Sequence, residues 1–436
     1  MKIYPYPSQA AEERLAEIQS RSLTFSSSDY QTVSDILEDI RENGDEALLK
    51  YTHRFDSPTM AQKDIRVTKS EMKKARRSVA PEFSRALERA ATQIETFHRR
   101  QVRQSWIETD RDGILLGQLI RPVDAVGVYT PGGRSGQTPL VSSMLMCVIP
   151  AKIAGVKKIV VVTPPTRDGS INPHLLAAAS AVGVDEIYKA GSAWAIGALA
   201  YGTETIPKVD VVVGPGNIYV TLAKKIVSGT VGIDLIAGPS EILVIADQTA
   251  NAAFTAADLL SQAEHDPLAS SVLVTDSPQL ASEVAQSVEQ QIEALSRKEI
   301  AKASLANYGA IFTVEDMETA TSLANRLAPE HLELHVETPL NLMSKIRHAG
   351  AIFMGHYTPE PVGDYIAGPN HVLPTVGTAR FASALSVDNF IKKTSIIQYD
   401  QKAFLAEADD IICLAQIEGL GAHAQSVKIR LDDGKK

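Results

Sequence analysis

The spacing of hydrophobic residues changes near residue 105 of the chain. Before that point, apolar positions recur every three or four residues, as in SSSDYQTVSDILEDIRENGDEALLKYTHRF, which is typical of amphipathic helices. Thr68 and Glu71 have the spacing of a helix capping box, and a long amphipathic helix is expected from about Pro81 to Trp106. This N-terminal part therefore predicts a set of helices.

Strand and helix patterns alternate in the rest of the chain. Two strand-like runs, LLGQLIRPV and AVGVYTP, lead into the glycine-rich turn TPGGRSG at residues 130–136. The later expected strands are IVVVTPP, EIYKAG, VDVVVGPGN, EILVIAD, SVLVTD, GAIFTV and GAIFMG. Their alternation with helical segments predicts two α/β units with parallel sheets, followed by a small helical segment over the last ~50 residues. In such folds we expect ligands beyond the carboxyl ends of the strands.

Composition narrows the class of protein. The chain has 436 residues, 44% hydrophobic and 22% charged, which is typical of a soluble globular protein with two or more domains. The net charge of −9 and the lack of a basic cluster argue against nucleic-acid binding. The N-terminus has no signal-peptide pattern, and lysine, proline and glycine interrupt the most apolar stretch, LVSSMLMCVIPAKIAGVKKIVVV. We therefore expect no membrane segment.

The two cysteines, Cys147 and Cys413, lie far apart in apolar runs. This arrangement excludes a disulfide framework and a CxxC metal site, which suits a reducing cytoplasm. Neither cysteine has a nearby histidine or glycine-rich turn to activate it, so we expect both in the hydrophobic core.

The segment LSQAEHDP, residues 260–267, concentrates groups that can bind metal or transfer protons. Gln262 and His265 are three residues apart, so on a helix they share a face and can present two donor atoms to one metal ion or substrate. The alternative is a solvated last helical turn that ends at Pro267.

A second segment, LAPEHLELH, pairs Glu330 with His331. On a strand these side chains would point to opposite faces, whereas at a helix start after Pro329 they would diverge by only about a quarter of a turn. Both could then line one cavity, with a carboxylate to activate water and an imidazole to move protons. The alternative is a surface turn; His335 is expected on a partly buried strand.

Two further segments carry polar groups. Asp364 and His371 lie in VGDYIAGPNHVLPT, a glycine- and proline-rich loop of the kind that often carries function. Glu418 and His423 flank a helix break in IEGLGAHAQS, where a C-cap and an exposed histidine are the alternative.

Four of these side chains form a mixed set of metal-binding groups: Gln262, His265, Asp364 and His423. The set supplies nitrogen and oxygen but no sulfur. Imidazole and carboxylate suit a zinc site with exchangeable positions, whereas structural zinc prefers closed, cysteine-rich sites.

Glycine-rich turns alone do not establish a nucleotide site. GLGAHA, at 419–424, matches GxGxxG/A but follows a helical run, so we reject it as a dinucleotide motif. GPGN, at 214–217, follows a strand, and its backbone amides could approach a phosphate or ribose. A tight turn between strand and helix explains GPGN equally well.

Six stretches, in chain order, resemble histidinol dehydrogenases: YTPGG, VVVGPGNIYVT, DLIAGPSEILVIAD, DLLSQAEHDP, LAPEHLEL and VGDYIAGPNHVLPT. The likeness covers nearly the whole chain. It implies an α/β fold with two incomplete Rossmann-like domains, similar to aldehyde dehydrogenases, and helical N- and C-terminal segments in a domain-swapped homodimer. The implied parts are an N-terminal arm (1–27), a first α/β domain (28–131 with 239–377), a second α/β domain (132–238) and a C-terminal helical domain (378–436) that contributes to the partner's active site.

The resemblance also implies an activity. It is the oxidation of L-histidinol through L-histidinaldehyde to L-histidine, the last step of histidine biosynthesis, with two NAD+ in succession and one zinc ion per subunit, in the cytoplasm. Glu330 and His331 match the family's acid–base pair. The matches to zinc ligands are Gln262, His265, Asp364 and His423, the last supplied across the dimer. These four and His331 also match substrate contacts, together with Ser240, His371 and Glu418; the matches to cofactor contacts are Tyr129, Trp194 and Asn217.

Two features depart from the family pattern. Many family members have glutamine in a GGAQA stretch that faces NAD+, whereas this chain has GSAWA with Trp194. An indole cannot accept a hydrogen bond, although it could stack on a ring of the cofactor. The turn PGGRSGQTPLVSS is also longer than the family's usual turn, so we expect the mouth of the cofactor site to differ in shape.

Three other functions fit parts of the sequence. The nearest is a related NAD-dependent dehydrogenase of another small polyol or amino alcohol, but Asp364 and His371 match the histidinol pattern. A zinc hydrolase with Glu330 as general base would need ligand spacing such as HExxH, which is absent. A non-catalytic metal- or metabolite-binding protein would leave the Glu330–His331 pair unexplained.

Overall fold

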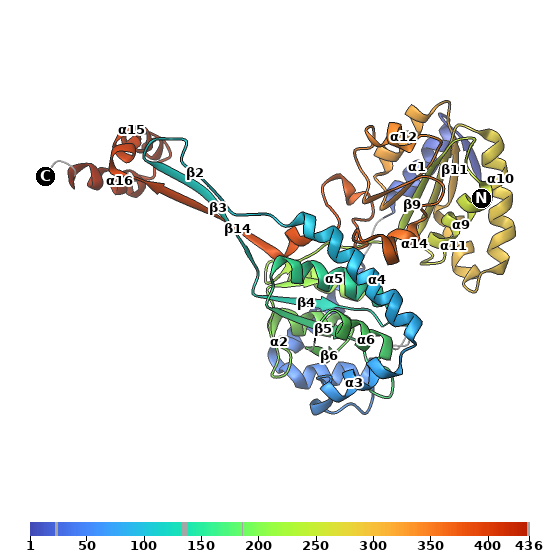
Figure 1. Cartoon of the computed structure of the whole chain (residues 1–436), viewed down its shortest axis with the longest axis horizontal. Helices are drawn as coiled ribbons and strands as arrows, with labels where there is room; N and C mark the ends of the chain where they lie inside the picture. The colour runs from blue at the N-terminus through green and yellow to red at the C-terminus, as the bar shows by residue number, and fades with distance from the viewer. Residues whose placement is uncertain (22–24, 133–137, 185, 434–436) are drawn as a thin grey trace. The chain divides into compact units, whose positions relative to one another are not determined.

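The structure is a computed structural model, and it describes residues 1–21, 25–132, 138–184 and 186–433 (Figure 1). The long turn expected at the cofactor mouth includes residues 133–137, which lie outside the described residues.

Contacts divide the chain into two compact units. The first is Met1–Gln101 with Val123–Phe390, and the second is Val102–Pro122 with Ile391–Lys436. The first unit contains two all-parallel sheets with helices on both faces, so the mixed α/β fold expected from the alternating patterns is confirmed.

The larger sheet of the first unit has six parallel strands. Their order is β1 (Ile3–Pro5), β11 (Ala310–Thr313), β10 (Ser270–Thr275), β9 (Glu241–Ala246), β12 (His331–His335) and β13 (Ala351–Met354). One face packs on α1 (Gln9–Ser20) and α12 (Met317–Leu327), and the other on α9 (Ala252–Ala263), α10 (Pro278–Gln291) and α11 (Lys298–Tyr308). Because both faces are covered, the central strands are continuous apolar runs.

The smaller sheet has five parallel strands. Their order is β6 (Ile187–Lys189), β5 (Lys158–Thr163), β4 (Ala125–Tyr129), β7 (Val211–Val213) and β8 (Gly232–Ile233). One face packs on α2 (Ser27–Phe55), α7 (Ser192–Tyr201) and α8 (Ile218–Val227), and the other on α3 (Lys69–Ser78), α4 (Pro81–His98), α5 (Val141–Ala154) and α6 (Pro173–Ala181). The N-terminal helices thus cover a sheet whose strands come later in the chain.

The second unit combines a three-stranded antiparallel sheet with two helices. The strand order is β14 (Ile391–Tyr399), β3 (Ile114–Pro122) and β2 (Trp106–Glu108), and α15 (Gln401–Ile417) packs on α16 (Gly421–Asp433). The expected helical C-terminal segment is present, but it begins with a long strand that the sequence pattern did not indicate.

Several local expectations can be compared with the structure. Thr68 caps α3 with Glu71 in the expected box. The helix expected as far as Trp106 is wrong in its extent, because α4 ends at His98 and Trp106 begins strand β2. Cys147 is buried as expected, whereas Cys413 is exposed, so its expected core position is wrong.

None of the helices in the described ranges is long and apolar enough to cross a membrane.

Candidate active site

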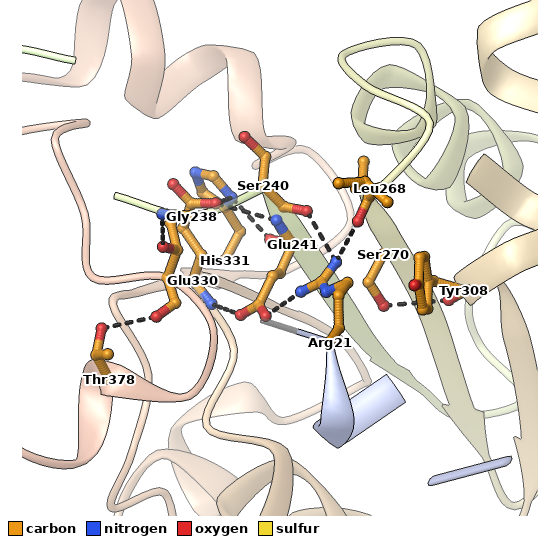
Figure 2. A network of polar contacts seen from close by, with 12 residues as sticks. Arg21, Gly238, Ser240, Glu241, Leu268, Ser270, Tyr308, Glu330, His331 and Thr378 are labelled. Carbon is orange, nitrogen blue, oxygen red and sulfur yellow. Dashed lines mark hydrogen bonds and ion pairs between the residues drawn. The ribbon is translucent and has the colours of Figure 1, made fainter. Parts of the chain in front are cut away.

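A buried carboxylate, Glu330, meets a partly buried one, Glu241, where β9 and β12 begin side by side. Glu241 is the first residue of β9, and Glu330 directly precedes β12. The Glu241 amide donates to Glu330 Oε2 over 3.0 Å, and the Glu330 amide donates to Glu241 Oε2 over 3.2 Å (Figure 2). These reciprocal bonds fix both side chains at the amino ends of their strands. Glu330 and His331 therefore lie at the end of the sheet opposite to the one where ligands were expected.

Arg21 supplies the positive charge beside this pair. Its side chain is buried, forms an ion pair with Glu241 and donates to the Leu268 carbonyl over 2.9 Å (Figure 2). Burial raises the pKa of Glu241, and the Arg21 guanidinium opposes that rise. Glu330 has no such cation among the described residues, and burial together with the charge of Glu241 raises its pKa well above the usual range.

His331 begins strand β12, so the strand alternative for the Glu330–His331 pair holds and a helix start is wrong. Its Nδ1 lies 2.9 Å from the carbonyl oxygen of Glu241 and 3.7 Å from Glu330 Oε2. Because a carbonyl only accepts, Nδ1 carries the hydrogen and Nε2 has the free lone pair. Burial lowers the pKa of His331, which favours the neutral base. The backbone of Glu241 thus brings both side chains of the pair to one place, although neighbours on a strand normally diverge.

The segment after β13 brings more carboxylates to His331. Glu360 lies in the short helix α14 (Glu360–Val362), and Asp364 lies in the single π-helical turn Gly363–Ala367 that follows. Glu360 Oε1 is 3.8 Å from His331 Nε2, and ligand atoms of His331, Glu360 and Asp364 all lie within 4.8 Å of one another. Burial raises the pKa of Glu360 to about 8 and, with Glu360 nearby, that of Asp364 to about 7. Such a crowd of acids would be relieved by a bound cation.

His371 joins this group from the same loop. Its Nδ1 is 3.9 Å from Asp364 Oδ1, and its Nε2 is 3.5 Å from the Ser143 hydroxyl on α5. Asn370 anchors the loop by donating to the Met146 carbonyl over 2.6 Å. A cavity of about 340 Å³ is lined by this loop, including Asp364 and His371. The loop therefore places the His371 imidazole beside the Asp364 carboxylate, and the functional roles of both residues remain predictions.

Gln262 and His265 lie at the end of α9. Gln262 is in the last turn and fully buried, and neither atom of its amide has a hydrogen-bond partner among the described residues. His265 lies two residues beyond the helix, is exposed, and its amide donates to the Gln262 carbonyl over 3.2 Å. An unpaired buried amide is costly, so Gln262 suits a position that binds a metal or ligand.

Glu418 and His423 belong to the second unit, where both are exposed. Glu418 is the C-cap residue of α15, and His423 lies near the start of α16. A helix break with a C-cap residue and an exposed histidine is thus what the single chain contains, and their roles toward a partner remain predictions.

The expected cofactor contacts lie around the carboxyl ends of the smaller sheet. Tyr129 ends β4, and its hydroxyl accepts from the Ser192 amide over 3.2 Å. Asn217 caps α8, because its side-chain oxygen accepts from two amides at 3.1 Å. Trp194, only 4% exposed, stacks between Tyr51 and Phe55 at centroid distances of 6.0 Å and 5.5 Å.

Ser240, an expected substrate contact, directly precedes β9 beside this network. Its carbonyl accepts from the Ser270 amide over 3.0 Å and faces Arg21 (Figure 2). The contact of its hydroxyl with substrate remains a prediction.

Sequence reasoning missed Arg21, Glu241 and Glu360. Glu241 carried a usable signal, since it is a carboxylate at the head of the buried run EILVIA. Charged residues are rarely buried without a partner, so such a position indicates a network or a site. Arg21 and Glu360 stand in ordinary polar surroundings in the sequence. Only the tertiary fold brings Arg21 to Glu241 and Glu360 to His331.

The parallel sheets and the buried imidazole–carboxylate cluster define an α/β protein whose site is equipped to bind a cation and move protons. The chain belongs to the histidinol dehydrogenase family, whose model matches residues 19–431, and it is thus assigned to a family of oxidoreductases. Histidinol dehydrogenases of Desulfotalea psychrophila and Bacillus cereus are 55% and 54% identical over 399 and 403 residues, with 92% of each chain covered. The crystal structure of histidinol dehydrogenase from Elizabethkingia anophelis is 39% identical and matches with a TM-score of 0.93, covering 100% of this chain and 99% of that chain. The resemblance inferred from six motifs is confirmed.

Proposed function

We propose that the chain oxidises L-histidinol through L-histidinaldehyde to L-histidine, with two NAD+ in succession and one zinc ion per subunit. Family membership supports the reaction. The observation that carries the proposal is the arrangement at His331, where Nδ1 donates to the Glu241 carbonyl on the side of Glu330, and Nε2 is left as a base that faces Glu360. A zinc hydrolase would use the same carboxylate but would need no nicotinamide cofactor.

His331 is the proton acceptor in this proposal. Each oxidation removes a hydroxyl proton as hydride leaves carbon for NAD+. Nε2 takes the proton of the alcohol, passes it to solvent before the second half-reaction, and then takes that of the hydrated aldehyde. Burial keeps the imidazole neutral before the transfer, and the charge of Asp364 favours the imidazolium formed afterwards.

Glu330 activates the water that adds to the aldehyde. A carboxylate whose pKa is raised is a stronger base than an ordinary one, and burial beside Glu241 raises the pKa of Glu330. The Glu241 amide holds Oε2, so the side chain keeps its position through both half-reactions. The route needs no thiol, in keeping with Cys147, whose thiol pKa is raised by burial in the core.

Gln262, His265 and Asp364 would hold the zinc ion, with His423 reaching it from the other subunit of a homodimer. The buried, unpaired amide of Gln262 and the crowded acids around Asp364 fit a cation here. Zinc would supply an anchor for the imidazole and amine nitrogens of histidinol, which are good donors for that ion.

The remaining contacts with substrate and cofactor are proposed from where each residue lies in the fold. Ser240 and His371 would bind substrate in the same subunit, and Glu418 would do so from the other subunit. Tyr129 and Asn217 lie around the carboxyl ends of the smaller sheet, where a nicotinamide dinucleotide would bind. Trp194 would border that site through its packing on Phe55.

The decisive experiment measures NADH release with histidinol, before and after chelation and zinc repletion. We expect two NADH per histidinol, activity lost on chelation and regained with zinc. If the protein oxidised other amino alcohols or polyols but left histidinol unchanged, the assignment of histidinol as its substrate would be wrong. Turnover without NAD+ would favour the hydrolase.

A further inference from the structure

A buried ion pair lies next to the turn that leads to Asn217. Lys224 projects from α8, and Asp234 directly follows β8. Their side chains are only 3% and 1% exposed, and the Lys224 ammonium contacts Asp234 Oδ1. A buried ion pair seldom stabilises a fold more than well-packed apolar residues would. The presence of this pair in the core therefore points to a role other than stability.

Both charged groups form hydrogen bonds with the main chain of Gly214, the first residue after β7. Lys224 Nζ donates to the Gly214 carbonyl over 3.0 Å, and the Gly214 amide donates to Asp234 Oδ2 over 2.8 Å. Gly214 is buried, so without these partners its backbone groups would lose hydrogen bonds that water cannot replace. The ion pair thus fixes the peptide groups on both sides of Gly214.

Gly214 also determines how closely the turn approaches strand β4. Its φ of +114° is open to glycine but strained for residues with a side chain. A Cβ atom at this position would lie 2.1 Å from the carbonyl oxygen of Tyr129. The turn therefore lies directly on the backbone of Tyr129, a proposed cofactor contact, and three residues later it reaches Asn217, another such contact.

Asn217 is oriented at the end of the same turn. Its side-chain oxygen accepts from the Tyr219 and Val220 amides, each over 3.1 Å, which leaves its amino group to meet a ligand. A hydroxyl or phosphate oxygen of a dinucleotide is a suitable acceptor for that amino group. A shift of the Gly214 peptide would move the start of α8, and with it this amino group.

We propose that Lys224 and Asp234 are positioning residues for the nicotinamide dinucleotide. Their ion pair holds the turn at residues 214–217 on Tyr129, in the geometry that receives the cofactor. Neither side chain is exposed enough to touch the cofactor, so both act through Gly214. This inference rests on the proposed function, because it takes NAD+ as the molecule that binds at this turn.

The test replaces both charges together, so that neither is left buried alone. In Lys224→Met/Asp234→Leu, apolar side chains fill the space and the Gly214 backbone loses both partners. We expect the Kd for NADH, measured by fluorescence titration of the full-length protein, to rise about tenfold or more, since one lost buried hydrogen bond accounts for about that factor. The KM for NAD+ should rise in parallel, while kcat at saturating NAD+, the KM for histidinol and the zinc content stay close to wild type.

The double variant Lys189→Met/Glu71→Gln is the matched control. It also removes one positive and one negative charge from an ion pair beside the smaller sheet, in which Lys189 Nζ lies 2.7 Å from Glu71 Oε1. Among the described residues, this pair makes no hydrogen bond to the turn at 214–217. The affinity of the control for NADH should therefore stay close to wild type.

Several results would overturn the proposal. They are a folded Lys224→Met/Asp234→Leu that binds NADH as tightly as wild type, an equal loss of NADH affinity in the control, and a parallel loss of affinity for histidinol. If this variant does not fold, Lys224→Met/Asp234→Asn takes its place, because asparagine still accepts from the Gly214 amide. If neither folds, the pair serves stability and the proposal is wrong. A wild type that binds no NADH would refute the proposed cofactor, and this inference with it.

Discussion

Nδ1 of His331 lies 2.9 Å from the main-chain carbonyl oxygen of Glu241, the first residue of the neighbouring strand. The parallel pairing of β12 with β9 places His331 opposite Ile242, which brings the imidazole to that carbonyl. One backbone contact therefore sets the tautomer of the ring and aims Nε2 at the Glu360 carboxylate, 3.8 Å away. A strand pairing thus determines the chemical state of the proposed base.

Replacing His331 with asparagine separates the two roles of the ring. The asparagine amide can still donate to the Glu241 carbonyl, but no atom replaces Nε2. We expect kcat for histidinol to fall by about 10²–10⁴ with zinc content unchanged, since general-base catalysis contributes about that much. Steady-state kinetics and metal analysis check this, with His348→Asn as a control. A kcat within threefold of wild type would remove His331 from the chemistry.

Replacing Glu330 with glutamine should affect one half-reaction more than the other. The amide oxygen can still accept from the Glu241 amide, but the side chain can no longer take a proton from water. We expect NADH per histidinol to fall from two toward one while histidinaldehyde accumulates and zinc content is kept. Rapid-quench measurement of the aldehyde tests this. Oxidation of added histidinaldehyde at the wild-type rate would show that Glu330 does not activate water.

Replacing Arg21 with methionine should cost far more stability than removing a surface cation. The change leaves the largely buried Glu241 without its ion-pair partner beside Glu330, and breaking a buried pair costs about 3–5 kcal/mol. Lys298→Met is the matched control, because its pair with Glu293 is exposed and worth at most about 1 kcal/mol. Urea unfolding compares the two variants. Equal losses of unfolding free energy would show that the Glu241–Glu330 network does not need the guanidinium.

Replacing Trp194 tests whether the indole serves the core or the cofactor. The ring is almost fully buried and stacks on Tyr51 and Phe55. Trp194→Ala should therefore lower the free energy of unfolding by about 3–5 kcal/mol, and Trp194→Phe by clearly less, since it keeps an aromatic ring. Both are measured by denaturant unfolding. If Trp194→Phe were as stable as wild type but had a many-fold higher KM for NAD+, the main role of the indole would be at the cofactor.

The sequence could predict the parts of the fold that depend on local patterns. Valine-rich runs between helical segments indicated the buried strands, and Asp364 with His371 was recognisable because both stand in one glycine- and proline-rich loop. The resemblance to a family connected motifs that lie hundreds of residues apart. Each of these inferences used either neighbouring residues or a known combination of motifs.

The remaining features depend on contacts between distant segments. Strand β1 pairs with β11 across some three hundred positions of sequence, from Ile3 to Ile311, and no local pattern encodes such a partner. The Glu241–Glu330 exchange likewise joins strands that are adjacent only in the sheet. The end of α4 at His98 was missed because the apolar spacing continues past it, while the next residues turn toward β2.

His98 should make the stability of the protein sensitive to acid. The ring is fully buried, its Nδ1 donates to Gln101 Oε1 over 2.7 Å, and its Nε2 has no hydrogen-bond partner among the described residues. Burial lowers the pKa of His98 in the folded state below the value of about 6.5 that it has when unfolded. The unfolded chain therefore binds the proton first as the pH falls, and this group reduces stability from about pH 6.5 down to its lower folded pKa.

The variant His98→Gln cannot take up that proton, so its stability should fall less steeply over the same pH range. Urea unfolding of wild type and variant at several pH values from 7.5 to about 5 measures the difference in slope, whatever the offset between the two proteins. Every other titrating group is common to both and cancels in the comparison. Parallel curves would mean that His98 is not held neutral in the folded protein, and a steeper fall for the variant would reverse the assigned direction of the shift.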